Sequence, residues 1–399
     1  MTTNRQLFLN HLAPTSDEPL LLEIVSASGC EMKTADGKTL IDLISGISVS
    51  NIGHCHPEVV NAVTEQTSRY MHLMVYGELI QSPQVQLAEA LTATLPGQLN
   101  SCYFVNSGSE AVEAAMKLAK RVTGRTLLAG FENAYHGSTQ GALSLIGSEY
   151  FRNSFRPLLP GIVHLRFNDF ADLDLINDQT AAVIFEVIQG EAGALPAKTG
   201  YLKALSDKCS QTGTLLIADE IQTGFGRTGT FMAFEDEGVV PDMLLLAKGM
   251  GGGMPIGALV ASRDLMRHFS SDPVLGHITT FGGHPVCCAA ALASLKVVKS
   301  IPESETTAKG KLFRKLLVHP MIAEITGKGL LMGVTFPSEA FNKEVIKRCI
   351  ASGVFTDWFL FAPHKMRIAP PLTITDHQIF MSCEVILAAV EATHKAGFR

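Results

Sequence analysis

The sequence of 399 residues is poor in charge: charged residues make up 18%, below the ~25% that is typical of soluble chains. The formal net charge of -6 offers no basic surface for nucleic acid. No apolar run reaches the ~18 residues that span a bilayer, and the first residues lack the pattern of a signal peptide. These absences predict a cytoplasmic protein without a nucleic-acid or membrane partner. The low charge also favours an oligomer that buries surface against a second subunit.

Cysteine patterning excludes two further classes. The eight cysteines are scattered, no metal-ligand spacing recurs, and a disulfide framework is not expected in a chain of this length. We therefore expect reduced thiols and no metal site.

Apolar runs and helical patterns alternate through the middle of the chain. Residues 109–121 have a helical pattern, because Ala111, Ala115, Leu118 and Ala119 share one face. Runs that suit strands cover residues 101–105, 125–130, 162–165, 181–185, 214–218, 243–247 and 256–261. The alternation predicts an α/β fold with a mainly parallel sheet.

Three domain segments follow from this pattern. The α/β layer predicts a large domain at residues 50–285. Residues 20–43 resemble short strands with a turn at Asp36-Gly37, and residues 287–300 a long helix. We expect residues 1–49 and 286–399, from both termini, to form a smaller α+β domain.

Lys248 ends the apolar run that begins at Met243, and a glycine-rich segment, 249–258, follows it. A lysine at the end of a buried strand loses solvation, so its pKa falls and its amine becomes nucleophilic. The glycines leave room for a planar ring against the backbone. The pattern indicates a lysine that forms a Schiff base. The alternative is a lysine that extends its ammonium group into water at a strand end.

Other charged residues also follow apolar runs. Glu186, Asp219 and Glu220 take such positions, as Lys248 does. Carboxyl ends of parallel strands lie at one edge of a sheet, where ligands of open α/β sheets bind, so we expect these residues in one cleft. Asp219 could pair with a protonated ring nitrogen of a cofactor, or it could only accept hydrogen bonds from loop amides.

The segment 104–110 joins a strand to a helix. The amides of Gly108 and Ser109, together with the helix dipole, form an anion site to which Ser107 adds a hydroxyl. The alternative is an ordinary serine N-cap. After another strand come Tyr135 and His136, where an aromatic ring could stack on a flat cofactor.

Long motifs in order resemble class III (ω-type) aminotransferases, similar to acetylornithine, ornithine and 4-aminobutyrate aminotransferases. The similar segments are 51–57, 106–110, 186–191, 219–229, 246–257, 279–283 and 366–371, which span nearly the whole chain. The resemblance implies fold type I, pyridoxal 5'-phosphate as the cofactor, and a homodimer with shared active sites. It also implies an amino donor and a 2-oxo acid as substrates, with ping-pong half-reactions through the Lys248 Schiff base.

The family pattern also implies individual roles. Lys248 and Asp219 would be catalytic. Thr280 would reach the phosphate of the neighbouring subunit, and Gln222 would bond the ring hydroxyl. The cofactor-binding residues would be Ser107, Gly108, Ser109, Tyr135, His136, Asp219, Gln222, Lys248 and Thr280.

Substrate contacts are implied less sharply. Arg367 would bind an α-carboxylate, and Glu191 would neutralise Arg367 for a substrate that lacks one. Tyr76 lies in a stretch that lines the substrate pocket in the family. Acetylornithine-type enzymes usually carry arginine where this chain has Ser138, so the choice of donor stays open.

Two other functions compete with amino-group transfer. The same cofactor and lysine serve decarboxylases, racemases and aminomutases of this fold. A non-catalytic binding protein would also keep the fold, although so complete a set of site residues argues against it.

Overall fold

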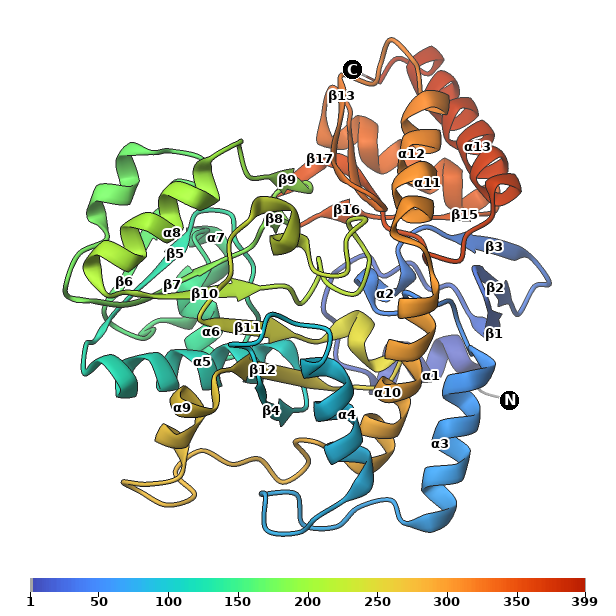
Figure 1. Ribbon diagram of the computed structural model, residues 1–399. Coiled ribbons are helices and arrows are strands. Elements are labelled where there is room, and N and C mark those ends of the chain that lie inside the picture. Colours follow the sequence, from blue (N-terminus) through green and yellow to red (C-terminus); the bar gives the residue numbers. More distant parts are fainter. Residues whose placement is uncertain (1–2, 399) are drawn as a thin grey trace.

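The computed structural model describes residues 3–398, which form one seven-stranded sheet, two four-stranded sheets and a two-stranded ribbon (Figure 1). In the large sheet, β12 runs antiparallel to both neighbours and all other pairs are parallel. The predicted strands agree with the observed ones to within a couple of residues. The spatial order is β4 (Ser101–Val105), β12 (Gly257–Ala261), β11 (Met243–Leu246), β10 (Leu215–Asp219), β7 (Thr180–Phe185), β5 (Leu127–Phe131) and β6 (Ile162–Leu165).

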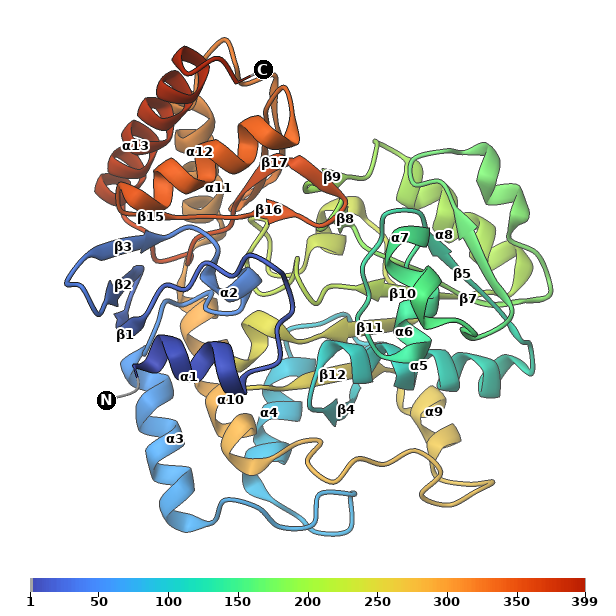
Figure 2. The same cartoon turned by 180° about the vertical axis from the view of Figure 1, so that it is seen from behind.

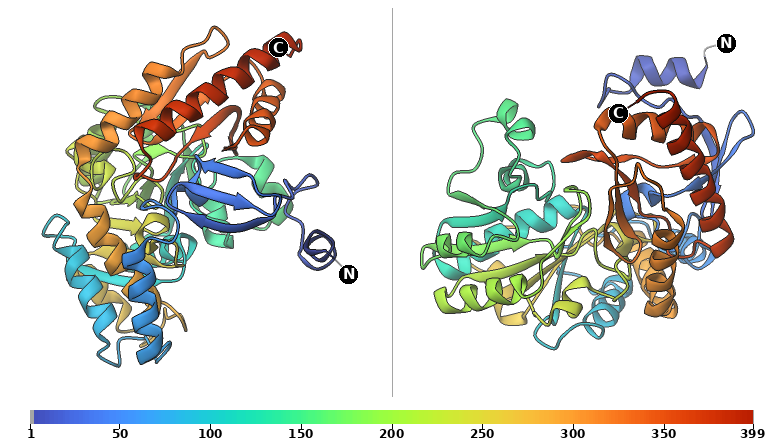
Figure 3. Two further views of the ribbon diagram at one scale, coloured as in Figure 1. Left: turned by 90° about the vertical axis from the view of Figure 1, so that its right-hand side faces the viewer. Right: turned by 90° about the horizontal axis from the view of Figure 1, so that it is seen from above.

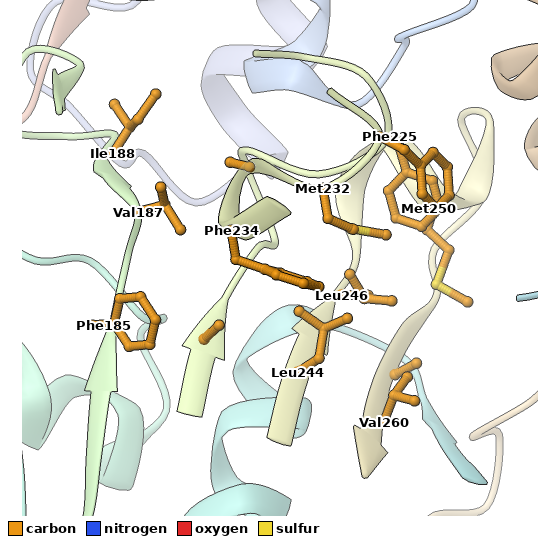
Figure 4. Packing of buried hydrophobic residues seen from close by; sticks show 14 of the residues in the cluster. Phe185, Val187, Ile188, Phe225, Met232, Phe234, Leu244, Leu246, Met250 and Val260 are labelled. Carbon is orange, nitrogen blue, oxygen red and sulfur yellow. The ribbon is translucent and has the colours of Figure 1, made fainter. Parts of the chain in front are cut away.

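Both faces of this sheet are buried, because successive side chains of a strand point to opposite sides. In β7, Val183 and Phe185 join a core cluster with side chains of α8 and α10, whereas Ala182 and Ile184 pack with those of α5. Figure 4 shows part of the first cluster, with Phe234 over the strand side chains. A sheet covered on both faces leaves its strand ends as the place for polar groups.

The helices surround the sheets (Figures 1 and 2). α10 packs on α3 and α4 beside the large sheet, and α11, α12 and α13 pack with the smaller C-terminal sheet. α1 has no buried residue and stands away from the body (Figure 3). Their bounds are α1 (Asn4–His11), α2 (Ser45–Ser48), α3 (Pro57–Arg69), α4 (Ser82–Thr92), α5 (Gly108–Thr123), α6 (Gln140–Leu145), α7 (Glu149–Arg152), α8 (Tyr201–Thr212), α9 (Arg263–Met266), α10 (Pro285–Ser300), α11 (Glu303–Leu316), α12 (Glu339–Ala351) and α13 (Asp376–Lys395).

The two ends of the chain share a sheet. β15 (Val354–Phe355) pairs in parallel with β3 (Thr39–Asp42), which continues through β2 (Glu31–Thr34) to β1 (Ile24–Ser28). Gly37, at φ 86°, forms the turn predicted between β2 and β3. This pairing supports a small domain from both termini, and the boundaries at residues 49 and 285 stay our proposal. The other small elements are β13 (Glu324–Lys328), β14 (Leu331–Thr335), β17 (Ala362–Ile368) and β16 (Trp358–Phe359) in one sheet, and β8 (Ile188–Gln189) with β9 (Leu195–Pro196).

Arg227 connects these parts from inside the protein. Its fully buried guanidinium donates to the carbonyl oxygens of Leu330, at 3.0 Å, and Pro370, at 2.5 Å. It also donates to Ser45 Oγ, at 3.2 Å, and Asn51 Oδ1, at 2.5 Å. Burial lowers the pKa of Arg227 to about 9. The donors of one side chain thus join three segments that are distant in sequence.

Within residues 3–398, no single helix has both the length and the apolar composition to cross a membrane. α10 and α11 pass that test only as a pair bent by 73°, and the α10 side chains lie largely in the core.

Candidate active site

Three charged residues meet where neighbouring parallel strands end. Glu186 directly follows β7, Asp219 is the last residue of β10, and Lys248 lies just beyond β11. All three line one cavity of about 400 Å³. The predicted convergence at one edge of the sheet is therefore confirmed for these residues.

The prediction was wrong for Glu220. Its carboxylate accepts hydrogen bonds from the Thr223 hydroxyl and from the Phe234 amide, the latter at 2.7 Å, and it does not line the cavity. Adjacent residues at a strand end point to opposite sides, so Asp219 and Glu220 cannot share one cleft. Burial raises the pKa of Glu220 to about 7.

Asp219 is linked to a buried histidine. His136 Nδ1 lies 2.7 Å from Asp219 Oδ2, and the Ile221 amide donates to Asp219 Oδ1 at 3.0 Å. Burial opposes the charge on His136, but the bond and charge of Asp219, with the charge of Glu186, outweigh it and raise the pKa of His136. This arrangement orients the Asp219 carboxylate at the cavity wall.

Glu186 accepts hydrogen bonds from the amides of Gly190, at 3.0 Å, and Tyr135, at 3.2 Å. Burial raises its pKa to about 7, against the lowering effect of His136. Glu186 therefore carries a proton over part of the neutral pH range.

Lys248 has a backbone φ of 44°, in the left-handed region, and such a conformation in a non-glycine residue persists where the surrounding structure imposes it. No hydrogen bond or ion pair joins its Nζ to any of residues 3–398. Burial lowers the pKa of Lys248, Glu191 opposes this and Arg367 adds to it. The result is an unpaired amine with reduced affinity for a proton, which is the state that a nucleophile needs.

The start of α5 forms one wall of the cavity. Ser107 Oγ accepts a hydrogen bond from the Glu110 amide at 3.2 Å, so the N-cap alternative is confirmed for this hydroxyl. A side chain at Gly108 would approach Ile221 Cδ1 to 2.8 Å, and one at Gly137 would approach Ser109 Oγ to 2.1 Å. Small residues thus keep the helix N-terminus open to an anion.

Tyr135 and Gln222 complete the cavity wall. The Tyr135 hydroxyl lies 3.0 Å from Ser138 Oγ, on the exposed side of the site. Gln222 is 7% exposed, and its Nε2 has no hydrogen-bond partner among the described residues. His136 Nε2 is also buried without such a partner. Buried donors and acceptors are normally satisfied, so these atoms indicate a polar ligand.

Arg367, in β17, forms ion pairs with two carboxylates. Its Nη1 and Nη2 lie 2.9 and 3.0 Å from the two oxygens of Glu191, and its Nε lies 2.9 Å from Asp357 Oδ1. Nη2 also donates to the Trp358 carbonyl oxygen at 3.1 Å, and the guanidinium lies 4.5 Å from the Phe359 ring centre. Asp357 was not predicted, because it belongs to no motif and lies in the two-residue connection between β15 and β16.

Burial and pairing compete in this cluster. Burial opposes charge on Glu191, but Arg367 outweighs it and lowers the pKa of Glu191. Burial likewise opposes charge on Arg367, yet the two carboxylates raise its pKa. For Asp357 burial prevails over Arg367 and raises the pKa to about 6. Glu191 is thus the firmly ionised partner, and Asp357 the weaker acid.

Five further predicted residues do not line the cavity of Lys248: the exposed Ser138, the paired Glu191 and Arg367, and Tyr76 and Thr280. Tyr76 lines a second cavity of about 510 Å³, together with Ile278 and Thr279. Thr280 follows Thr279 and is exposed. The chain therefore brings Tyr76 and the segment around Thr280 together, but apart from its own Lys248.

The cavity fits pyridoxal 5'-phosphate by its chemistry. An open helix N-terminus suits the phosphate, Asp219 suits a protonated ring nitrogen, and the unsatisfied Gln222 amide suits a ring substituent. Lys248 supplies the amine that such a cofactor requires. These features define a pyridoxal-phosphate enzyme with a mainly parallel sheet, the architecture of fold type I.

Comparisons with known proteins narrow the class. The sequence model of the family described as Aminotransferase class-III matches residues 12–390. The chain is 42% identical to an acetylornithine aminotransferase of Methanopyrus kandleri over 81% of this chain and 82% of that protein. It is 40% identical to an acetylornithine aminotransferase of Corynebacterium efficiens, with 90% of each chain covered.

Solved structures agree with this result. The ornithine aminotransferase of Toxoplasma gondii superposes with a TM-score of 0.92 at 29% identity, covering 99% of this chain and 96% of that one. An (S)-enantioselective omega-transaminase from Thermomicrobium roseum gives 0.87 at 28% identity, with 97% of each chain covered. The chain belongs to the class III aminotransferases. It is a pyridoxal-phosphate-dependent aminotransferase, and these relatives give no support to the decarboxylase, racemase, aminomutase or binding-protein alternatives.

Proposed function

We propose that this aminotransferase takes the amino group from the ω-carbon of an amine or amino acid and passes it to a 2-oxo acid. The observation that carries the proposal is the buried, two-pronged pair of Arg367 and Glu191, whose charges both act on the pKa of Lys248. The named substrates of the relatives, acetylornithine and ornithine, point to the same kind of donor.

We assign the chemical roles as follows. Pyridoxal phosphate, when bound, carries the amino group between the substrates and accepts the electron pair of the bond that is broken at carbon. Lys248 Nζ binds the cofactor and then moves a proton at the substrate carbon that bears nitrogen. Asp219, oriented by His136, holds a positive charge on the ring nitrogen, and the start of α5, with Gly108 and Ser109, binds the phosphate.

The Arg367–Glu191 pair would let one site accept two kinds of substrate. An arginine fork binds both oxygens of a carboxylate, so a 2-oxo acid can take the place of Glu191. A donor that presents only its ω-amine would otherwise leave the buried Nη1–Nη2 edge of Arg367 without a carboxylate, which is costly. Glu191 then stays on Arg367.

Single-turnover rates of the two half-reactions test this proposal. We expect N-acetylornithine, ornithine or 4-aminobutyrate to convert the enzyme to its amino form faster than alanine does. Arg367→Ala should slow mainly the half-reaction with 2-oxoglutarate or pyruvate. Glu191→Ala should shift the preference towards α-amino acids, because the competing carboxylate is gone. Donors restricted to α-amino acids in the parent enzyme, or equal losses in both half-reactions, would contradict it.

We also propose a homodimer with shared active sites. Thr280 and Tyr76 lie apart from their own Lys248, and the family resemblance assigns Thr280 to the site of the partner. Large exposed apolar side chains gather in the same two segments, including Met71, Leu73, Met74, Ile80, Val274, Leu275, Ile278 and Phe281. Mixing Thr280→Ala with Lys248→Ala subunits should restore part of the activity, since one hybrid dimer holds one intact site. No recovery after proven subunit exchange would refute shared sites.

The cytoplasm is our proposal for the compartment. All eight cysteines are free, as expected for a protein kept in a reducing environment. Fractionation of cells that express the tagged chain would test this, and recovery with an oxidising compartment would contradict it.

A further inference from the structure

Arg367 uses all edges of its guanidinium. The Nη1–Nη2 edge faces Glu191, whereas Nε faces Asp357 and the Phe359 ring covers one flat side. Arg367 is 2% exposed. If one of these partners moves away, the remaining partners determine the orientation of the Arg367 guanidinium.

The two carboxylates reach Arg367 from different segments of the chain. The Arg367 amide donates to the Asp357 carbonyl oxygen at 2.9 Å, and the Thr356 hydroxyl donates to the Arg367 carbonyl oxygen at 2.6 Å. The turn that carries Asp357 thus adjoins the Arg367 strand through main-chain contacts. Glu191 comes from the segment after β8, far away in sequence. Its Oε2 also accepts from the Leu360 amide at 3.0 Å, and its main-chain carbonyl oxygen accepts from the Phe361 amide at 3.1 Å.

We propose that Asp357 is a positioning residue of the amino-acceptor site. It anchors Arg367 through Nε, so that carboxylate exchange takes place by movement of Glu191 while Arg367 stays in place. The inference rests on the proposed function, because the exchange of Glu191 for a substrate carboxylate is part of it.

Charge explains why an acid suits this position. Without Asp357, the buried guanidinium would have no counter-ion between the departure of Glu191 and the arrival of the substrate, and such a cation is costly. Asp357 keeps one carboxylate on Arg367 during that interval. Because Asp357 occupies Nε, an incoming carboxylate can bind only at the Nη1–Nη2 edge, which fixes the pose of the 2-oxo acid.

This role has a selective consequence. An acceptor without a carboxylate leaves Glu191 on Arg367, and Glu191 alone can then hold the guanidinium. Loss of Asp357 should therefore impair 2-oxo acids and spare simple aldehydes.

The test uses the holoenzyme in its amino form with pyruvate, 2-oxoglutarate or butanal in single turnover. For Asp357→Ala we expect the half-saturation concentration of both 2-oxo acids to rise about tenfold or more, the scale of one charge-assisted hydrogen bond. The value for butanal should stay within about twofold. Asp357→Asn keeps an oxygen that can accept a hydrogen bond from Nε. It should therefore show a smaller rise in the half-saturation concentration than Asp357→Ala, and it serves as the test if Asp357→Ala folds poorly. Asp264→Asn, at an exposed ion pair with Arg267, is the matched control and should behave as the parent.

Equal losses with aldehyde and 2-oxo acid would overturn the proposal and make Asp357 a structural residue, as would unchanged values for all three acceptors. A parent enzyme that transfers no amino group to any 2-oxo acid would instead refute the proposed function itself. The two failures are therefore distinguishable.

Discussion

The two ends of the active site are built in different ways. At the strand ends of the large sheet, Asp219 and Glu186 each accept hydrogen bonds from backbone amides. These donors are part of the main chain and are not replaced when a substrate binds. At the other end, Arg367 is held mainly by the side chains of Glu191 and Asp357, from two separate segments, with one further bond to the Trp358 carbonyl oxygen. The first arrangement keeps the groups of the common chemistry in place, and the second allows partners to change with the substrate.

This difference gives a rule for where substitutions should act. At the strand ends backbone amides support Asp219 and Glu186, so a conservative change there should alter rate more than stability. In the Arg367 cluster the charges support one another, so removing one leaves others buried without a partner. The following predictions test this contrast.

The largest effect is expected for Lys248→Ala. Turnover should fall by more than the ~10²–10⁴-fold of one general acid–base group, because covalent catalysis is lost as well. Stability of the apoenzyme should hardly change, since Lys248 makes no ion pair. Steady-state rates and denaturant titration measure both, with the exposed Lys203→Ala as control. A variant with near-native turnover would disprove the role of Lys248.

Arg367→Ala should have the largest effect on folding. Glu191 and Asp357 would remain in a poorly hydrated place without their cation, and breaking a buried ion pair in this way costs about 3–5 kcal/mol. Urea titration of the apoenzyme at pH 7 gives the loss in unfolding free energy. Adding Asp357→Asn should recover part of it, because one uncompensated charge is removed. An unchanged unfolding free energy would show that the charges of the Arg367 cluster do not support one another, and the contrast with the strand ends would fail.

Asp219→Asn should show the opposite pattern. The asparagine can still accept from the Ile221 amide, but a charge-assisted bond contributes about 1.5–3 kcal/mol, or roughly 10–150-fold in rate. The pKa of His136 should fall, because the bond and charge of Asp219 act to raise it. NMR titration of the histidine in the apoenzyme gives this readout independently of activity. Lost stability with an unchanged rate would assign Asp219 to the fold alone.

The last prediction concerns the dependence of stability on pH. The folded pKa of Glu186, about 7, lies above its ordinary value of 4.5, so the folded state binds more protons than the unfolded chain between these values. Its contribution to stability is therefore present below pH 4.5 and declines as pH rises to about 7, by at most ~1.4 kcal/mol per pH unit. Glu186→Gln should remove this component from the pH dependence of unfolding. Parallel curves for variant and parent would contradict the raised pKa.

Much of the strand-end region could be predicted from sequence. A buried strand has a short apolar run, and its end is marked where a polar residue interrupts that run, as at Asp219 and Lys248. Parallel pairing then brings such ends together, even though the residues are far apart in the chain. The family motifs added the roles and the cofactor, which spacing alone did not supply.

The substrate end could be predicted only in part. Asp357 lies between two strands of two residues each, too short to show any periodicity, and its contact with Arg367 depends on how β16 and β17 pair. The prediction for Glu220 was wrong because the apolar pattern marks where the strand ends but not to which side each side chain points there. Tyr76 and Thr280 were predicted from the family resemblance, whereas their separation from Lys248 depends on tertiary packing.

The parallel pairing of β15 with β3 has a consequence for folding during synthesis on the ribosome. β1, β2 and β3 are complete within the first 42 residues, but the strand that borders them is formed by Val354 and Phe355. A ribosome adding about 5–20 residues per second needs on the order of 15–60 s to reach that point. During this interval the N-terminal sheet has an open edge, which can pair with other chains. The nascent protein should therefore be most prone to aggregation before its last fifty residues emerge.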